Sequence, residues 1–248
     1  MAGSAGVPPR PLPLGLADLL LMLIAGFGSS RLLLPVLAQG LGIRVGAGSD
    51  NVLPVMFLLG VQTLMLLIVI YVVAVRWRGV SLRELGFVSP PAGWLTRAVL
   101  LALLSLPLVG AISWLQQELT GQPFENPQFQ VIAPPSFAWA NYLATLLVAA
   151  VIAPAVEEIA FRGILYRWLA ERTRWPLAIA GSALVFAFLH GVPSLIPGIL
   201  VLGAILAWVY QRTRSIWAPI VLHGTYNAAV TTALYAALAQ GVRPSGMG

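Results

Sequence analysis

Long apolar runs alternate with short polar connections along the chain, a pattern typical of membrane-spanning helices. An α-helix of about 20 apolar residues crosses the hydrocarbon core of a bilayer. The pattern predicts spans at residues 14–39, 53–75, 98–117, 137–169, 176–190, 194–210 and 216–238. Because the later runs are short, an eighth helix or a re-entrant piece fits the same pattern. The predicted fold is all-α, a polytopic membrane helical bundle of about 7–8 transmembrane helices.

The connections predict little other regular structure. Residues 76–87 are basic, and we expect them to lie at the membrane interface as a short amphipathic helix. Residues 118–136 contain four prolines and predict a loop. Residues 1–13, rich in proline, glycine and alanine, predict a flexible N-terminal tail. No polar stretch is long enough for a second domain, so residues 1–248 are predicted to form a single integral-membrane domain.

Composition supports this fold and narrows the partners. Hydrophobic residues make up 59% of the chain and charged residues only 9%, against about 25% charged in a soluble domain. Cysteine is absent, which excludes disulfides and cysteine-ligated zinc. The net charge of +6 comes from arginine without lysine, a composition that suggests a bacterial source. Most arginines lie in short connections, so the expected partner is the lipid bilayer and no nucleic acid.

The distribution of arginine predicts an orientation. The connections at 76–97, 167–175 and 211–215 carry four, three and two arginines, whereas those at 40–52 and 118–136 carry one and none. With seven spans, the three rich connections fall on one side of the membrane. The positive-inside rule makes that side cytoplasmic. The N-terminus is then cytoplasmic and the C-terminus outside, in what we expect to be a bacterial cell membrane.

Two adjacent glutamates, Glu157 and Glu158, lie within the fourth predicted span. A charged side chain at the bilayer centre costs about 2.5–3.5 kcal/mol on insertion scales, so the pair requires compensation. Arg162 follows Glu158 by four residues, the favourable order for an ion pair on a helix. Glu157 points about 100° away and has no partner nearby in sequence. We therefore interpret Glu158 as a structural residue and Glu157 as a functional one.

Both histidines of the chain, His190 and His223, also lie in predicted spans, and Asn227 shares a helix face with His223. Counting about 1.5 Å per residue from the cytoplasmic ends puts these groups at similar depths, so we expect one pocket. A carboxylate and an imidazole can activate water, while a second imidazole and a carboxamide can stabilise an oxyanion. Together they indicate amide hydrolysis. Singly, a buried histidine or asparagine is as well explained by helix packing.

Three motifs at these residues resemble the CPBP family (CAAX proteases and bacteriocin-processing enzymes, also called Abi), which includes the type 2 CAAX prenyl endopeptidases. They are Glu-Glu-x-x-x-Arg at 157–162, Phe-x-x-x-His at 186–190 and His-x-x-x-Asn at 223–227. They occur in order, the resemblance covers about residues 140–230, and no key position departs from the pattern. Arg83-Glu-Leu-Gly-Phe also resembles a segment that these proteins often carry upstream.

The resemblance implies an intramembrane endopeptidase with a catalytic core at about 137–238. In that interpretation Glu157 and His190 activate the water, and His223 and Asn227 stabilise the oxyanion. Glu158 and Arg162 support the site. The family is often labelled as metalloproteases, and Glu157, His190 and His223 could bind zinc or another divalent metal. The sequence lacks His-Glu-x-x-His, and we favour the interpretation that requires no cofactor.

Two other functions stay open. A non-catalytic membrane scaffold or partner-binding protein would keep the Glu158–Arg162 pair for packing, although it would not need His190 or Asn227. A proton-coupled transporter would also use intramembrane glutamate and histidine, but the chain shows no internal repeat. For an endopeptidase, the expected substrate is a membrane-associated peptide or protein. Neither its prenylation nor the oligomeric state follows from the sequence.

Overall fold

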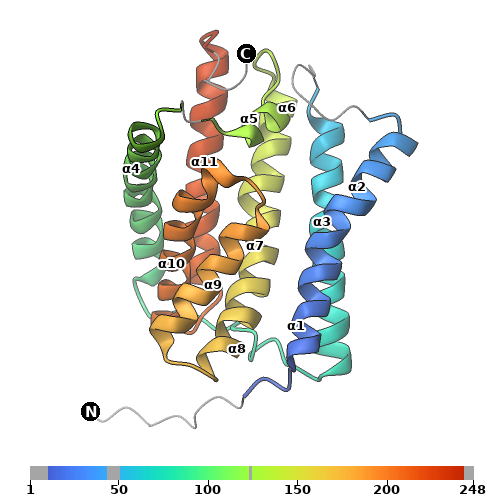
Figure 1. Cartoon of the computed structure of the whole chain (residues 1–248), viewed down its shortest axis with the longest axis vertical. Helices are drawn as coiled ribbons and strands as arrows, with labels where there is room; N and C mark the ends of the chain where they lie inside the picture. The colour runs from blue at the N-terminus through green and yellow to red at the C-terminus, as the bar shows by residue number, and fades with distance from the viewer. Residues whose placement is uncertain (1–10, 44–50, 123–124, 243–248) are drawn as a thin grey trace.

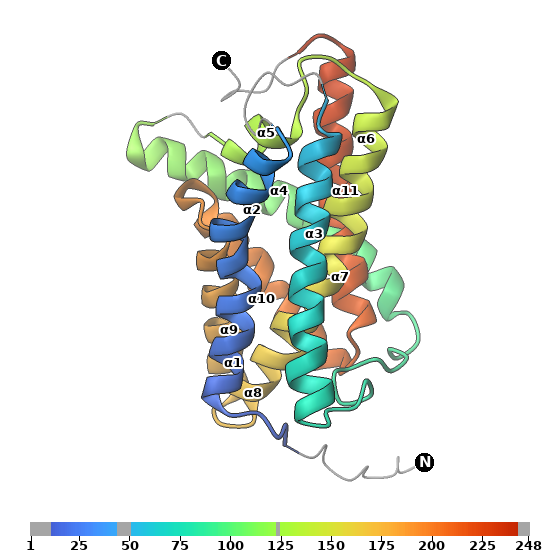
Figure 2. The ribbon, with the colours of Figure 1, turned by 90° about the vertical axis from the view of Figure 1, so that its right-hand side faces the viewer.

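The computed structural model describes residues 11–43, 51–122 and 125–242. All regular structure within these ranges is helical, with no β-strand, which confirms the all-α prediction. The helices form an elongated bundle in which most run close to the long axis (Figure 1). Figure 2 shows α4 (Trp94–Thr120) tilted across the bundle relative to the others.

The first predicted span contains α1 (Leu16–Leu23), the π-helical segment η1 (Ile24–Gly28) and α2 (Ser29–Gly40). The second is α3 (Leu53–Ile70), which continues into the π-helical η2 (Tyr71–Trp77). In both views α1 and α2 lie alongside α3 (Figures 1 and 2).

The fourth predicted span is a continuous helix, Trp139–Ala170. It contains α6 (Trp139–Thr145), the π-helical η3 (Leu146–Ile152), α7 (Ala153–Glu158), the π-helical η4 (Ile159–Tyr166) and α8 (Arg167–Ala170). Proline at position 154 lacks the N–H that an α-helix needs there, and π segments are frequent at functional sites. We refer to Trp139–Ala170 as the site helix.

The remaining helices are α9 (Trp175–Leu189), the 3-10 turn η5 (Pro193–Leu195), α10 (Ile196–Thr213) and α11 (Trp217–Ala239). Four helices of the described chain are long and apolar enough to cross a membrane: Leu53–Trp77, Trp94–Thr120, Trp139–Ala170 and Pro193–Thr213. Leu16–Gly28 and Trp175–Leu189 are shorter apolar helices. The chain is an integral membrane protein.

The predicted loop at 118–136 contains a short helix that the sequence analysis missed, α5 (Pro127–Ile132). The side chain of Asn126 accepts a hydrogen bond from the backbone N–H of Gln128 at its start. An asparagine cap followed by proline in the first turn is a recognised helix-start signal. The Asn126–Pro127 dipeptide is therefore the sequence signal that indicates the start of α5.

Residues 80–88, which we call the strap, do not form the predicted amphipathic helix. The strap instead packs beneath the bundle, with Leu85 buried. The Gly86 carbonyl accepts from the N–H of Ile216 at 2.8 Å. The φ of +96° at Gly86 belongs to the left-handed region, which favours glycine and prevents the helix from continuing.

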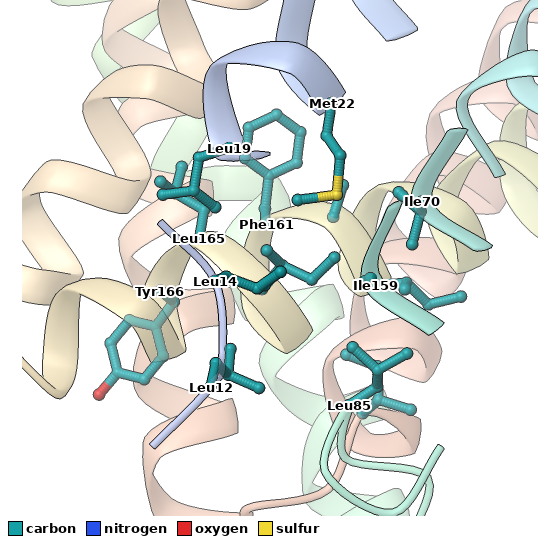
Figure 3. Close-up of a cluster of buried hydrophobic side chains, with 14 of the residues drawn as sticks. Leu12, Leu14, Leu19, Met22, Ile70, Leu85, Ile159, Phe161, Leu165 and Tyr166 are labelled. Carbon is teal, nitrogen blue, oxygen red and sulfur yellow. The ribbon is translucent and has the colours of Figure 1, made fainter. Parts of the chain in front are cut away.

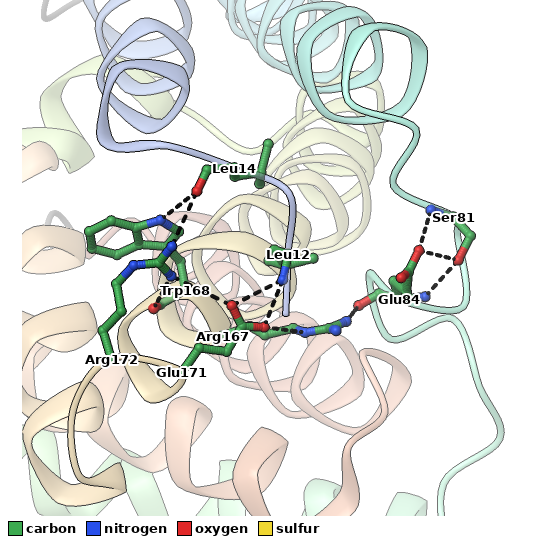
Figure 4. Close-up of polar contacts among 8 residues, drawn as sticks. All are labelled: Leu12, Leu14, Ser81, Glu84, Arg167, Trp168, Glu171 and Arg172. Atoms are coloured by element: carbon green, nitrogen blue, oxygen red, sulfur yellow. Dashed lines mark hydrogen bonds and ion pairs between the residues drawn. The ribbon is translucent and has the colours of Figure 1, made fainter. Parts of the chain in front are cut away.

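The largest cluster of buried side chains joins the start of the chain, the strap and the site helix (Figure 3). Every residue of η4, from Ile159 to Tyr166, is buried. Leu12 is buried as well, and its backbone N–H donates to the carboxylate of Glu171 at 3.0 Å (Figure 4). Residues 1–10 of the predicted flexible tail lie outside the described residues.

Polar contacts reinforce this end of the bundle (Figure 4). The indole N–H of Trp168 donates to the Leu14 carbonyl at 2.9 Å. Arg167 donates to the Glu84 carbonyl of the strap and forms an ion pair with Glu171 at 3.2 Å. The site helix is thereby fixed to the chain start and to the strap.

Candidate active site

Glu158 and Arg162 form the ion pair expected from their spacing. Nη1 of Arg162 lies 2.8 Å from Oε1 of Glu158, and both side chains are 0% exposed. Nη2 of Arg162 donates to the Gly203 carbonyl of α10 at 3.0 Å. The guanidinium also lies over the Phe186 ring, 4.5 Å from its centroid, a favourable cation–π geometry.

His223 contacts both glutamates. Its Nδ1 lies 2.8 Å from Oε1 of Glu158, and its Nε2 lies 3.9 Å from Oε2 of Glu157. A carboxylate paired with arginine only accepts hydrogen bonds, so Nδ1 of His223 carries a proton. Nε2 of His223, which does not bond Glu158, is the ring nitrogen that can exchange a proton or bind another group. A gap of 3.9 Å is too long for a direct hydrogen bond and suits one bridging water.

The two glutamates differ in access. The Glu157 side chain is 22% exposed, whereas that of Glu158 is fully buried. Because successive residues on a helix point about 100° apart, one carboxylate faces the packed core and its neighbour is partly exposed. The division of roles expected from the sequence is consistent with this difference.

His190 lies at the end of α9, where Gly191 with φ +68° stops the helix. Its Nδ1 is 2.7 Å from the Phe186 carbonyl, one of the last-turn carbonyls that lack an intrahelical donor. Nδ1 therefore donates, and no hydrogen bond or ion pair within the described ranges engages Nε2 of His190. The Phe186 ring lies edge-on to both imidazoles, with centroids 4.6 Å from His190 and 5.8 Å from His223.

Asn227 is already engaged with the site helix. Its Nδ2 donates to the Ala149 carbonyl of η3 at 2.8 Å. One N–H of the carboxamide is thereby used, and the second N–H and Oδ1 have no hydrogen-bond partner in the described part of the chain.

The structure thus gathers Glu157, Glu158, Arg162 and His223 directly, with His190 joined through Phe186. The expected pairing of Glu157 with His190 differs from what is found. In the described residues, His223 is the group that contacts Glu157, and no hydrogen bond or ion pair joins Glu157 to His190. The contact of His223 with both glutamates is set by tertiary packing, so spacing along the sequence gave no signal for it.

Zinc binding would require Glu157, His190 and His223 to lie close together around one point. Within the described ranges, no three histidine, aspartate or glutamate side chains are grouped closely enough to hold a metal ion. Glu157, His190 and His223 as arranged do not fit the tetrahedral zinc site that their chemistry could otherwise form.

Comparisons with known proteins point to the same part of the chain. Residues 138–229 match the family model described as "Type II CAAX prenyl endopeptidase Rce1-like". A relative named "Putative membrane peptidase YdiL", from Bacillus subtilis (strain 168), is 32% identical over 85 residues, which cover 34% of this chain. The match spans about a third of the relative's length, 35%. No solved structure matches.

Proposed function

We propose, starting from the membership of residues 138–229 in the CPBP (CAAX protease) family, that this chain is an intramembrane endopeptidase. Its substrate would be a membrane-associated peptide or protein. One observation carries the proposal: Glu157 and Nε2 of His223 lie 3.9 Å apart, with His223 fixed from behind by Glu158. This arrangement suits a water molecule that attacks a carbonyl.

Glu157 is proposed as the general base. It is the more accessible of the two carboxylates and removes a proton from the water as the oxygen attacks the scissile carbonyl carbon. His190 is proposed to help Glu157 activate this water through its Nε2. When the carbon–nitrogen bond breaks, the proton held by Glu157 passes to the leaving amine, and the carboxylate is regenerated.

The oxyanion would be stabilised by His223 and Asn227. Because Nδ1 of His223 is already bonded to Glu158, Nε2 donates to an oxyanion only when the ring is an imidazolium. Before attack, Glu157, Glu158, Arg162 and an imidazolium His223 carry two negative and two positive charges. After attack Glu157 holds the proton and the oxyanion supplies the second negative charge, so the set stays neutral. Asn227 contributes the N–H that Ala149 does not use.

No step of this mechanism passes through a metal ion. Both Nδ1 atoms are held by acceptors, as metal-ligating histidines are, yet the three side chains that would form the site are not gathered. The cofactor-free interpretation stays a prediction. Exhaustive chelation is expected to leave activity intact, and activity lost on chelation and restored by Zn²⁺ would refute it.

The alternatives make different demands on the same residues. A scaffold would need the Glu158–Arg162 pair, but it would gain nothing from the imidazole Nε2 of His223 beside an accessible carboxylate. A proton-coupled transporter would need access paths from both sides of the membrane. Neither accounts for the Glu157–His223 gap as directly as hydrolysis does.

The test compares Glu157→Gln with wild type in liposomes, using fluorogenic lipid-anchored peptides in prenylated and unprenylated forms. Loss of the base is expected to lower kcat about 10²–10⁴-fold with thermal stability unchanged. Glu118→Gln, at the far exposed end of α4, is the matched control and should behave as wild type. Stability that falls in step with activity would support a structural role for Glu157 instead.

A further inference from the structure

Proline at position 154 leaves the site helix short of one backbone donor. An N–H at this position would bond the Ala150 carbonyl in an α-helix or the Ala149 carbonyl in the π pattern of η3. Proline has no N–H. A carbonyl left without a partner inside the bundle is costly, so we expect another group to donate to one of these two oxygens.

Helix α11 approaches both of them. Asn227 donates from Nδ2 to the Ala149 carbonyl at 2.8 Å. Gly224 packs so closely that a Cβ added to it would lie 2.5 Å from the Ala150 carbonyl oxygen. Residues 224 and 227 are three apart and share a helix face, and His223 adjoins them in sequence. The gap that Pro154 leaves therefore faces the part of α11 that carries the proposed oxyanion donors.

We infer that Pro154 is a positioning residue for the Asn227 carboxamide. By leaving Ala149 in need of a donor, it fixes one N–H of Asn227 and so directs the other. The clasp formed by Pro154, Ala149 and Asn227, together with the Glu158–His223 bond at 2.8 Å, joins the site helix and α11 at two levels. The catalytic part of this inference rests on the proposed function, whereas the clasp itself does not.

A double-mutant cycle on thermal unfolding tests the clasp without any substrate. With Pro154 present, Asn227→Ala leaves the Ala149 carbonyl without a hydrogen-bond donor and should lower Tm by about 2–4 °C. In the Pro154→Ala protein the backbone N–H of residue 154 is restored and donates to a carbonyl at this site. The same Asn227→Ala change should then lower Tm by less than half as much. Equal losses of Tm in the two backgrounds would overturn the inference.

Activity then separates positioning from packing. Pro154→Ala should lower kcat about tenfold with KM unchanged, because the released carboxamide no longer points at the reacting oxygen. Pro107→Ala is the control, since Pro107 also lies inside a membrane helix, α4, far along the chain from the site. It should change neither kcat nor the cost of Asn227→Ala.

The outcomes are distinct from those that judge the protease proposal. If Asn227→Ala lowers Tm less in the Pro154→Ala background but kcat of Pro154→Ala is unchanged, the clasp exists and the positioning role is refuted. If Glu157→Gln were as active as wild type, the proposed mechanism would fail while the stability cycle still decided the clasp.

Discussion

At the scale of single residues, two identical side chains one position apart have different surroundings. Glu158 is enclosed by Arg162 and His223, whereas in the described part of the chain Glu157 has His223 at 3.9 Å as its one ion-pair partner and is partly exposed. The helix geometry produces this difference, because neighbouring residues point about 100° apart. A pair of glutamates that repel each other is thereby divided into a neutralised carboxylate and a more accessible one.

Arg162→Ala is expected to destabilise the protein strongly. Removing the guanidinium leaves Glu158 as an uncompensated buried charge and takes a donor from the Gly203 carbonyl. Breaking a buried pair in this way costs about 3–5 kcal/mol, which unfolding in detergent would measure. Arg212→Ala is the control, because Arg212 is exposed and its guanidinium lies 5.4 Å from the centroid of the Trp208 ring.

The control should cost no more than about 0.5 kcal/mol. Adding Glu158→Gln to Arg162→Ala should recover part of the loss, since it removes the stranded charge. An Arg162→Ala protein as stable as wild type would show that the pair does not hold this site together.

The sequence predicted some of these residue contacts and missed others for a clear reason. The Glu158–Arg162 pair lies within one helix turn, so spacing alone indicated it, and it is present at 2.8 Å. The partners of His223 and Asn227 lie 65 and 78 residues away in the chain. Nothing in local sequence specifies such contacts, so the roles assigned to His190, His223 and Asn227 stay predictions.

At the scale of elements, the strap (residues 80–88) links the two helices that carry the glutamates and His223. A Cβ on Gly163 of the site helix would lie 2.8 Å from the Leu85 carbonyl of the strap. The strap also bonds the start of α11 through Gly86 to Ile216, and through the Val88 carbonyl to the Ser215 hydroxyl at 2.5 Å. Glycine at position 163 is therefore required for close packing and not for flexibility.

Gly163→Ala is expected to lower both Tm and kcat, because the strap must move away and the two helices lose their common support. The matched control is Gly110→Ala in α4, where an added Cβ meets nothing within 4 Å. Alanine is the better helix former by about 0.5–1 kcal/mol, so the control should be neutral or slightly stabilised. Thermal unfolding gives Tm for both variants, and equal Tm values would contradict the role of the strap.

Element prediction succeeded where apolar runs were long and failed in the strap. The strap does begin as a helix would, since the Ser81 N–H and hydroxyl bond Glu84 at 2.8 and 2.7 Å. Gly86 then takes the left-handed conformation, and the chain changes direction after a single turn. Gly86 therefore ends the helix that the Ser81–Glu84 contacts begin, and Leu85 packs beneath the bundle.

At the scale of the whole molecule, the arginine asymmetry makes a prediction about topology. Because the chain contains no cysteine, single cysteines can report the side of the membrane without a background. Thr173→Cys, in an arginine-rich connection, should resist a membrane-impermeant maleimide in intact cells. Gln122→Cys, at the other end of the bundle, should react. The reverse pattern of labelling would invert the proposed orientation.

The match to the family model covers only part of the molecule. The matched segment, residues 138–229, contains the glutamates, both histidines and Asn227. The strap and the first two predicted spans lie outside it, yet they supply much of the buried cluster that surrounds η4. Sequence motifs therefore indicate the chemistry, whereas the support of the site becomes visible only in the fold.

The central claim is that Glu157 makes this chain a membrane endopeptidase. Its most direct test is quantitative mass spectrometry of protein termini in membranes from cells that produce either wild type or Glu157→Gln at equal levels. We predict that a small set of membrane-associated precursors accumulates uncleaved in the Glu157→Gln membranes and is processed in the wild-type membranes. Identical termini in the two samples would contradict the claim.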